Sequence, residues 1–447
     1  MKQDSQDLTS GSLSRKILTF SIPLMASNVL QVLFNMSDIA VVGQFAGAMA
    51  LGAVGSTTTL VTLFTGFLIG MGTGVNVLTA RYYGSKNKKD LSEVIHTSAV
   101  ICLISGVLIA LIGEVSARLI LDLLGTKTEL VDGALLYLRI YYLGMPAVAV
   151  YNFGNAVFSA IGNTKKPLVY LAVSGVVNVL LNLFFVIVCH MSVAGVAIAS
   201  ISAQYLSSIL ILNSLFHSED VYGMHVGKLK ITKTKARQIL AMGIPSGLQY
   251  AIFQIANLFI QGGVNTFNAV MVAGNSAAAN ADALIYDVMA AFYTACGSFM
   301  GQNYGAGKKD RVKKSYLISL GYSFGIAACM SAVLLMFGRE FLSLFTREAD
   351  VIDAGMKRLV IMGLSYPVSA FMDCTIAASR GLGKSVVPTV IVIMGSCVFR
   401  VVWIYTVFAY FGTFQSLYLL YVFSWSITAV AEVWYFKGVY KRMMQAA

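Results

Sequence analysis

Apolar stretches of about 20 residues recur along the whole chain, and they constrain the fold more than any other feature. Each stretch is long enough to cross a hydrocarbon layer roughly 30 Å thick. Of the 447 residues, 57% are hydrophobic and 12% are charged, whereas soluble domains carry about 25% charged residues. A soluble core could not bury so much apolar surface. We therefore expect an all-α, polytopic membrane protein.

The apolar stretches predict twelve transmembrane helices. Their approximate ranges are 14–42, 49–80, 94–113, 134–158, 168–189, 193–216, 238–262, 270–301, 315–337, 355–378, 388–411 and 414–436. In the second of these spans, Gly66, Gly70 and Gly74 share one helical face. Small residues at this spacing let neighbouring helices approach closely in lipid.

The distribution of Lys and Arg predicts how the chain is oriented. With a cytoplasmic N-terminus, the inside regions carry 24 of these residues and the outside loops carry six. The six are Arg118, Lys127, Arg339, Arg347, Lys357 and Arg358. An excess of positive charge marks the cytoplasmic side, so both termini are expected inside a multi-pass protein of the cytoplasmic (inner) membrane. The net charge of +12 then reports orientation, and we expect no nucleic-acid partner.

The chain also repeats itself. Residues 16–25 (KILTFSIPLM) return as 238–247 (QILAMGIPSG), and residues 81–90 (RYYGSKNKKD) return as 302–311 (QNYGAGKKDR). We therefore expect an N-terminal lobe at 1–216, a basic cytoplasmic linker at 217–237 and a C-terminal lobe at 238–447. Six spans is an even number, so the two repeats are parallel, and transporters built in this way bind substrate between their halves.

Three motifs occur in a characteristic order along these repeats. They are NMSDIAVVGQFAG (35–47) in the first span, GQNYGAG (301–307) after the eighth and SRGLGKSVVPT (379–389) after the tenth. With them, essentially the whole chain resembles the MATE (multidrug and toxic compound extrusion) family. The resemblance implies V-shaped lobes and a cation-coupled secondary antiporter, not an enzyme. Such a protein would export cationic or amphiphilic organic compounds across the bilayer by alternating access.

Asp38 is the acid of the first span and the leading candidate for a functional site. It lies about 33 Å along a helix that enters near residue 16, hence in the outer half of the membrane. A charge at mid-bilayer costs about 2.5–3.5 kcal/mol, so such acids are usually functional. The alternative is a structural hydrogen bond to an Asn or Ser of a neighbouring helix. The resemblance implies that the first-span carboxylate couples transport to a cation.

Asn178 and Asn182 lie four residues apart and share a face of the fifth span. The resemblance implies that some family members carry Asn and then Asp here, and that these form a cation or proton site with the first-span Asp. This chain has an amide at the second position. The alternative is that both amides simply bond between helices.

The second half supplies further candidates for a substrate or polar site. They are Gln254, Asp282, Asp287, Asp373 and Arg400. Arg400 keeps its charge at any accessible pH and therefore needs a partner. We favour Asp373, with Asp287 and Asp282 as alternatives, in either a structural or a functional role. Glu432 precedes Lys437 by five residues and is expected to be solvated at the cytoplasmic interface.

The resemblance also bears on the coupling ion. In the NorM branch it implies a seventh-span Glu, for which Gln254 is the nearest counterpart here. Together with the amide at Asn182, this leaves few anionic oxygens for Na⁺. We therefore favour H⁺ over Na⁺, and a DinF-like or MepA-like bacterial branch over NorM.

Other classes of function find little support in the sequence. ASRGLGKS (378–385) resembles a phosphate-binding loop, but Ala378 replaces the first Gly and no strand precedes it, so no nucleotide is expected. The cysteines and histidines show no metal or disulfide spacing, and we expect no cofactor. The nearest rival is a lipid-linked or polysaccharide flippase of the same broader superfamily, which should have a more basic central cavity. The sequence leaves the oligomeric state open, with a monomer favoured.

Overall fold

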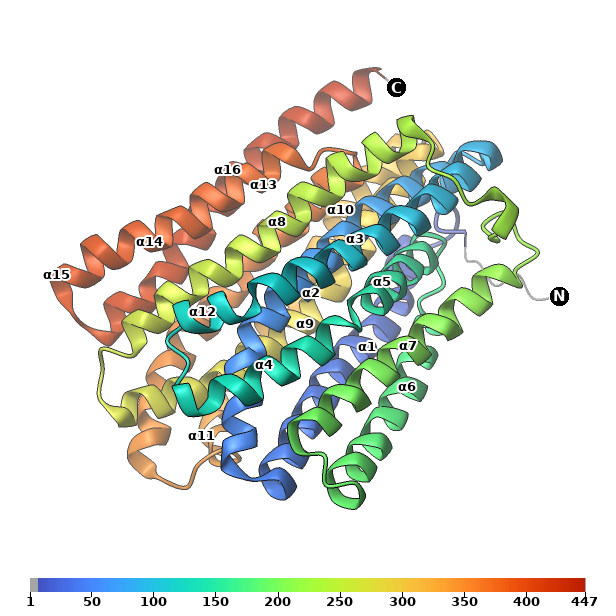
Figure 1. Cartoon of the computed structure of the whole chain (residues 1–447). Helices are drawn as coiled ribbons and strands as arrows, with labels where there is room; N and C mark the ends of the chain where they lie inside the picture. Colours follow the sequence, from blue (N-terminus) through green and yellow to red (C-terminus); the bar gives the residue numbers. More distant parts are fainter. Residues whose placement is uncertain (1–6, 447) are drawn as a thin grey trace. The chain divides into compact units, whose positions relative to one another are not determined.

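The computed structural model describes residues 7–446, which are almost entirely helical (Figure 1). Residues 1–6, at the start of the expected N-terminal lobe, lie outside this range. Residue 447, at the end of the expected C-terminal lobe, also lies outside it.

The first half of the described residues contains seven α-helices. They are α1 (Leu13–Val41), α2 (Gly47–Gly84), α3 (Lys88–Leu123), α4 (Thr128–Tyr142), α5 (Met145–Ala160), α6 (Lys165–Leu183) and α7 (Ser192–Phe216). Two π-helical turns follow α1 and α6, namely η1 (Val42–Ala46) and η2 (Phe184–Val188). A short 3-10 turn, η3 (Val226–Lys228), lies in the connection to the second half.

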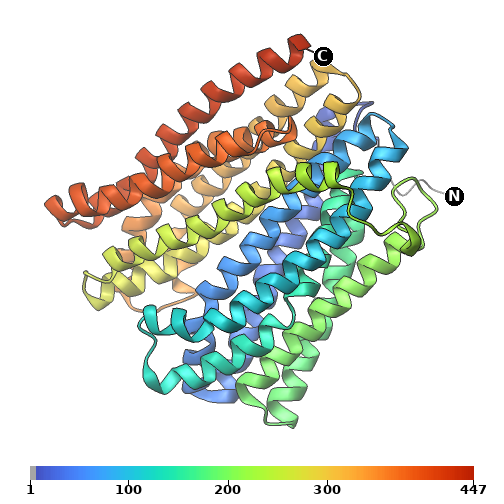
Figure 2. The ribbon, with the colours of Figure 1, turned by 45° about the horizontal axis from the view of Figure 1, so that its top comes forward.

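The second half begins with α8 (Lys233–Val264) and α9 (Ala269–Gly305). Next come α10 (Lys309–Met336), the short α11 (Gly338–Ser343) and α12 (Ala349–Gly381). The following span is interrupted by π-helical turns and consists of α13 (Val386–Val392), η4 (Ile393–Val398), α14 (Phe399–Trp403), η5 (Ile404–Phe408) and α15 (Ala409–Phe411). The last helix is α16 (Phe414–Ala446), which lies beside this interrupted span in both ribbon views (Figure 2).

These helices fall on all twelve predicted spans, so the predicted fold class is confirmed. Within residues 7–446, ten helical segments are long and apolar enough to cross a membrane, and the first of them, Leu13–Gly84, has 72 residues. At 1.5 Å per residue that segment would measure about 108 Å, more than three hydrocarbon layers. The chain instead turns back between α1 and α2, at Gly47, whose φ is +88°. A positive φ of this kind favours glycine.

One predicted span is broken. Residues 134–158 were expected to form a continuous helix, but α4 and α5 meet at Leu143–Gly144 with a bend of 47°. Pro146 stands in the first turn of α5, where its missing N–H leaves no hydrogen bond unmade. Together α4 and α5 are long and apolar enough for one crossing.

The chain divides into two compact units. Unit 1 contains Ala26–Ala251, and unit 2 contains Leu8–Met25 together with residues 252–446. The first part of α1 therefore belongs to unit 2, where Phe20 meets Phe299 of α9 with ring centroids 5.5 Å apart. Similarly, the first part of α8 belongs to unit 1, where Ile239 joins a buried core with Val75 of α2.

The glycine face of α2 packs against α8 inside unit 1. A Cβ added to Gly70 would lie 2.5 Å from the Cα of Gly247, and one added to Gly74 would lie 2.6 Å from the carbonyl oxygen of Ile239. Real Cβ atoms do not come so close to backbone, so only glycine allows this approach. The close helix approach predicted from the sequence is confirmed.

Candidate polar sites and family membership

Three helices of unit 1 converge on the carboxylate of Asp38. Asn178 and Asn182 of α6 each donate from Nδ2 to Asp38 Oδ1, at 2.7 and 2.5 Å. Ser200 of α7 donates to Asp38 Oδ2 at 3.2 Å. The structure therefore brings together the three residues predicted to form a coupling site and adds Ser200. No sequence signal distinguished Ser200 from the other serines of its span.

A single glycine lets α1 and α6 come together at this level. A Cβ added to Gly175 would overlap the ring of Phe34. Phe34 lies one helical turn before Asp38, and Gly175 lies nearly one turn before Asn178. The contact between Phe34 and Gly175 thus brings the carboxylate alongside the two amides.

The surroundings of Asp38 can hold either a charged or a protonated carboxyl group. Asn182 is fully buried and Asn178 is buried, while Asp38 itself is half-buried. Three donors stabilise the ionised form, because hydrogen bonds are strong at low local dielectric. The Oδ1 atoms of both amides are buried and make no hydrogen bond. An amide that turned over could therefore accept a hydrogen bond from protonated Asp38.

The same residues also define what a bound metal would require. A hard cation such as Na⁺ takes oxygen ligands. Here the groups that face Asp38 are amide nitrogens and one hydroxyl. Sodium would therefore need both amides to present their oxygens, whereas a proton needs only the carboxylate.

Unit 2 does not repeat this arrangement. In the first span the repeat offset is 222, so the counterpart of Asp38 is Ile260. At the offset of 221 that relates residues 81–90 to 302–311, the counterparts of Asn178 and Asn182 are Phe399 and Trp403. The two units therefore differ in chemistry where their sequences correspond.

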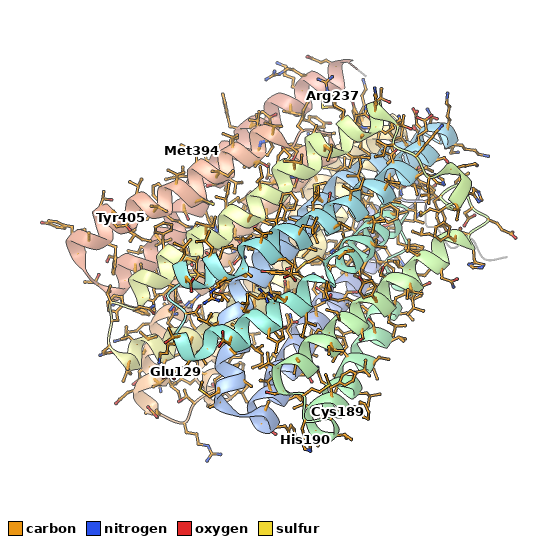
Figure 3. The ribbon with its side chains drawn as sticks, in the orientation of Figure 1. Glu129, Cys189, His190, Arg237, Met394 and Tyr405 are labelled. Carbon is orange, nitrogen blue, oxygen red and sulfur yellow. The ribbon has the colours of Figure 1, made fainter. Side chains whose placement is uncertain are left out.

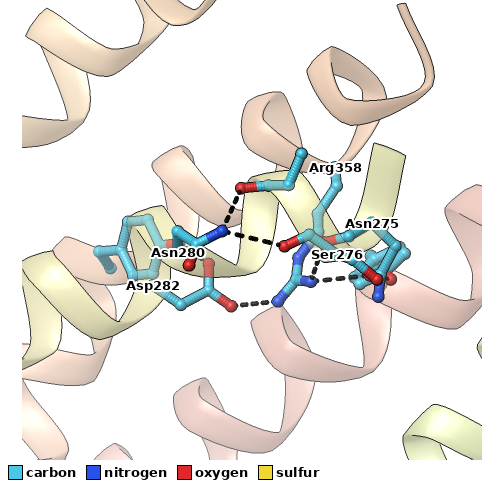
Figure 4. Close-up of polar contacts among 8 residues, drawn as sticks. Asn275, Ser276, Asn280, Asp282 and Arg358 are labelled. Carbon is cyan, nitrogen blue, oxygen red and sulfur yellow. Dashed lines mark hydrogen bonds and ion pairs between the residues drawn. The ribbon is translucent and has the colours of Figure 1, made fainter. Parts of the chain in front are cut away.

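Unit 2 instead contains an ion-pair network around Asp282 of α9 (Figure 4). Arg358 of α12 forms an ion pair with Asp282, and Tyr366 donates a hydrogen bond to the same carboxylate. Arg358 Nη1 also donates to the carbonyl oxygen of Asn275 at 3.0 Å and to its Oδ1 at 2.7 Å. Tyr418 of α16 donates to the same amide oxygen. A permanent positive charge thus compensates Asp282.

Arg358 was expected in an outside loop, but it lies within helix α12. Its side chain is only 7% exposed and lies more than two turns inside α12. Loop composition did not reveal this position because Lys357, next to it, carries the same charge and is exposed.

Arg400 has a different kind of neighbour from the one expected. It is 1% exposed, and its guanidinium carbon lies 4.5 Å from the ring centroid of Tyr421 and 5.7 Å from that of Trp425. Phe253 adds a third ring at 5.2 Å, and Nε donates to Ser424 Oγ at 3.2 Å. Within residues 7–446, no carboxylate lies within 4 Å of Arg400, so the expected ion pair with Asp373 is absent. Aromatic rings hold this cation through cation–π contacts.

The remaining candidates of the second half are spread over three helices. Asp373 is buried on α12. Gln254 is half-buried on α8, and Asp287 is half-buried on α9, five residues after Asp282. Glu432 contradicts the expectation of a solvated group, because it is 0% exposed. Its place on α16 next to α12 explains this burial, which its distance from Lys437 did not reveal.

A helical bundle of two units, with membrane-length helices and polar groups held inside each unit, is the architecture of a membrane transporter. The MatE family model matches residues 23–184 and again 245–406, so the chain belongs to the MatE family. The two matches start 222 residues apart, which confirms the internal repeat. MatE proteins are transporters, so the prediction that the protein is not an enzyme is confirmed as well.

Individual proteins support the same assignment. The chain is 29% identical over 365 residues to the "probable multidrug resistance protein YpnP" of Bacillus subtilis (strain 168), covering 81% of each chain. It is 25% identical over 394 residues to "probable multidrug resistance protein YoeA" of the same organism, covering 87% of this chain and 85% of YoeA. Its fold matches an outward-facing structure of a multidrug resistance MATE family transporter with a TM-score of 0.90, at 22% identity and 98% coverage of both chains.

Proposed function

We propose that this protein is a cation-coupled secondary antiporter that exports cationic or amphiphilic organic compounds by alternating access. The observation that carries the proposal is the half-buried carboxylate of Asp38, which is held by three neutral donors and has no ion-pair partner among residues 7–446. Such a group can bind either a cationic substrate or a coupling cation. The two relatives named as probable multidrug resistance proteins support export of small organic compounds.

In the proposed cycle, an entering cation neutralises Asp38 and weakens its hold on the substrate. One unit charge that moves through 100 mV gains about 2.3 kcal/mol. At about 1.4 kcal/mol per tenfold, that free energy supports roughly a fifty-fold concentration ratio of substrate. A single carboxylate can therefore couple the membrane potential to useful export.

We propose the proton as the coupling cation. The donors that face Asp38 favour its charged form, and their unpartnered amide oxygens can accept a hydrogen bond once Asp38 is protonated. Sodium would need a larger rearrangement, because both amides would have to reverse. The same reasoning favours a DinF-like or MepA-like branch over NorM.

The direct test is transport in proteoliposomes with H⁺ and Na⁺ gradients imposed separately. A cationic dye should be exported when the proton gradient is present and sodium is absent. Export that requires Na⁺ at fixed pH, and that persists when the proton gradient is collapsed, would overturn proton coupling. Failure to move any cationic dye under either gradient would overturn the antiporter assignment.

We further propose that the protein resides in the cytoplasmic membrane with both termini in the cytoplasm. We also propose that it works as a monomer, with its functional lobes at 1–216 and 238–447. The bias of Lys and Arg toward one set of loops supports the orientation.

A further inference from the structure

Glu432 is a carboxyl group inside unit 2 that the proposed transport cycle does not use. It lies on α16, is 0% exposed, and neither of its carboxyl oxygens has a hydrogen-bond partner. No Lys, Arg or His nitrogen of residues 7–446 lies within 4 Å of it. A carboxylate in this position would be both buried and uncompensated.

Asp373 shares these surroundings. It lies on α12, which packs along α16, and its Oδ2 is buried without a partner. Two cations act electrostatically on Asp373, Arg380 and then Arg400. Arg380 and Asp373 are likewise the two charges that act on Glu432. Two acids and two cations are therefore gathered in unit 2 without forming ion pairs between them.

The two cations already have other partners. Arg400 is enclosed by three aromatic rings and donates to Ser424, while Arg380 Nη2 donates to Thr389 at 3.3 Å. The other titratable groups near the acids are tyrosine hydroxyls and cysteine thiols. They are Tyr293 and Cys296 of α9, Tyr316 of α10, Cys374 of α12, Cys397 of η4 and Tyr435 of α16.

A buried, unpaired charge is so costly that a carboxylate in its place takes up a proton. We propose that Glu432 carries a proton in this conformation, and that Glu432 and Asp373 form a second protonatable site, inside unit 2 and separate from Asp38. The protonation itself is independent of the transport function, whereas a part in coupling rests on that function. Glu432 lies near the end of α16 that we expect to face the cytoplasm.

Loss of the proton would have a defined structural consequence. An ionised Asp373 would attract Arg400, whose Nη2 is buried and has no hydrogen-bond partner. Arg400 would then exchange its aromatic neighbours on α16 for an ion pair with α12. The second site could therefore change the packing between α12 and α16 according to its protonation state.

Infrared spectroscopy of the purified protein tests the proposal without any transport assay. At neutral pH the wild type should show the carbonyl stretching band of protonated carboxylic acids, shifted in heavy water. Glu432→Gln and Asp373→Asn should each lose part of that band. Glu340→Gln, which changes an exposed acid of α11, should leave it intact. A band that is unchanged in Glu432→Gln would overturn the proposal.

Stability against pH provides an independent measurement. Glutamine has the shape and neutral charge of protonated glutamate, so Glu432→Gln should unfold at the wild-type temperature below about pH 4.3, the ordinary pKa of an unfolded glutamate. As the pH rises further, Glu432 loses its proton readily in the unfolded wild type but not in the folded wild type. The unfolding temperature of the wild type should therefore fall more steeply than that of the variant. A Glu432→Gln variant that fails to fold, or is clearly less stable at acidic pH, would show that an ionised Glu432 is needed and would contradict the proposal. Because neither readout involves efflux, a negative transport result leaves this inference untouched.

Discussion

At the scale of single residues, the protein surrounds three charged side chains of its helices in three different ways. Neutral amides and a hydroxyl surround Asp38, a guanidinium pairs with Asp282, and aromatic rings enclose Arg400. Only the first arrangement allows the charge to appear and disappear easily. An acid beside a permanent cation is held ionised, and a guanidinium does not deprotonate. This difference is why we assign coupling to Asp38 and a structural role to the pair of Asp282 and Arg358.

The ion pair of Asp282 and Arg358 gives the first prediction. Asp282→Asn leaves Arg358 buried without its counter-charge and should destabilise unit 2 by about 3–5 kcal/mol. The double variant Asp282→Asn with Arg358→Met should recover much of that loss. Arg339 and Asp353 form a matched exposed pair, with side chains 63% and 52% exposed, and Asp353→Asn should cost less than about 1 kcal/mol. Thermal unfolding of the purified variants measures all three, and equal costs for Asp282→Asn and Asp353→Asn would contradict the structural role.

At the scale of the helices, close approach depends on individual glycines. Gly175→Ala places a methyl group where the ring of Phe34 lies, so α1 and α6 should separate next to Asp38. We expect a lower unfolding temperature and weakened efflux. Gly55→Ala on α2 is the matched control, because a Cβ there meets nothing within 4 Å. It should stabilise its helix by up to about 1 kcal/mol. Stability that rises in both variants would show that Gly175 does not position the site.

At the scale of the whole molecule, the orientation can be tested with one native and one introduced cysteine. Cys189 is exposed, and Figure 3 shows it at the opposite end of unit 1 from Arg237. In a protein that keeps only Cys189, an impermeant thiol reagent should label intact cells from outside. In a protein that keeps only a cysteine introduced as Lys86→Cys, in the turn between α2 and α3, labelling should require access to the cytoplasm. The reverse pattern would overturn the orientation.

The fold could be predicted from the sequence because its main signals are long and repeated. Apolar stretches of about twenty residues and a repeat that extends over half the chain remain recognisable even where the boundary of a single helix is uncertain. The break at Leu143–Gly144 was not predicted, because a proline inside an apolar span does not by itself break the helix: Pro367 lies within the continuous helix α12.

The site could be predicted only where a residue was unusual for its surroundings. Asp38 stood out as an acid in an apolar span, whereas Ser200 is one of many serines. Arg358 and Glu432 were misplaced because each lies near another charged residue close to a span end, and burial there depends on which helix packs alongside. Such packing is a tertiary property that spacing along the chain does not encode.

The central claim is that export depends on neutralising Asp38 once per cycle. The most direct measurement is proton-driven efflux of a cationic dye by wild type, Asp38→Asn and Asp38→Glu in expression-matched vesicles, with Asp122→Asn as an exposed control. Asp38→Asn keeps the shape of the side chain but remains permanently neutral, so it should insert and fold normally and lose gradient-driven efflux. Asp38→Glu should retain part of the activity, and Asp122→Asn should retain all of it. If Asp38→Asn pumps at the wild-type rate, Asp38 is only an interhelical hydrogen-bonding group and coupling lies elsewhere in the protein.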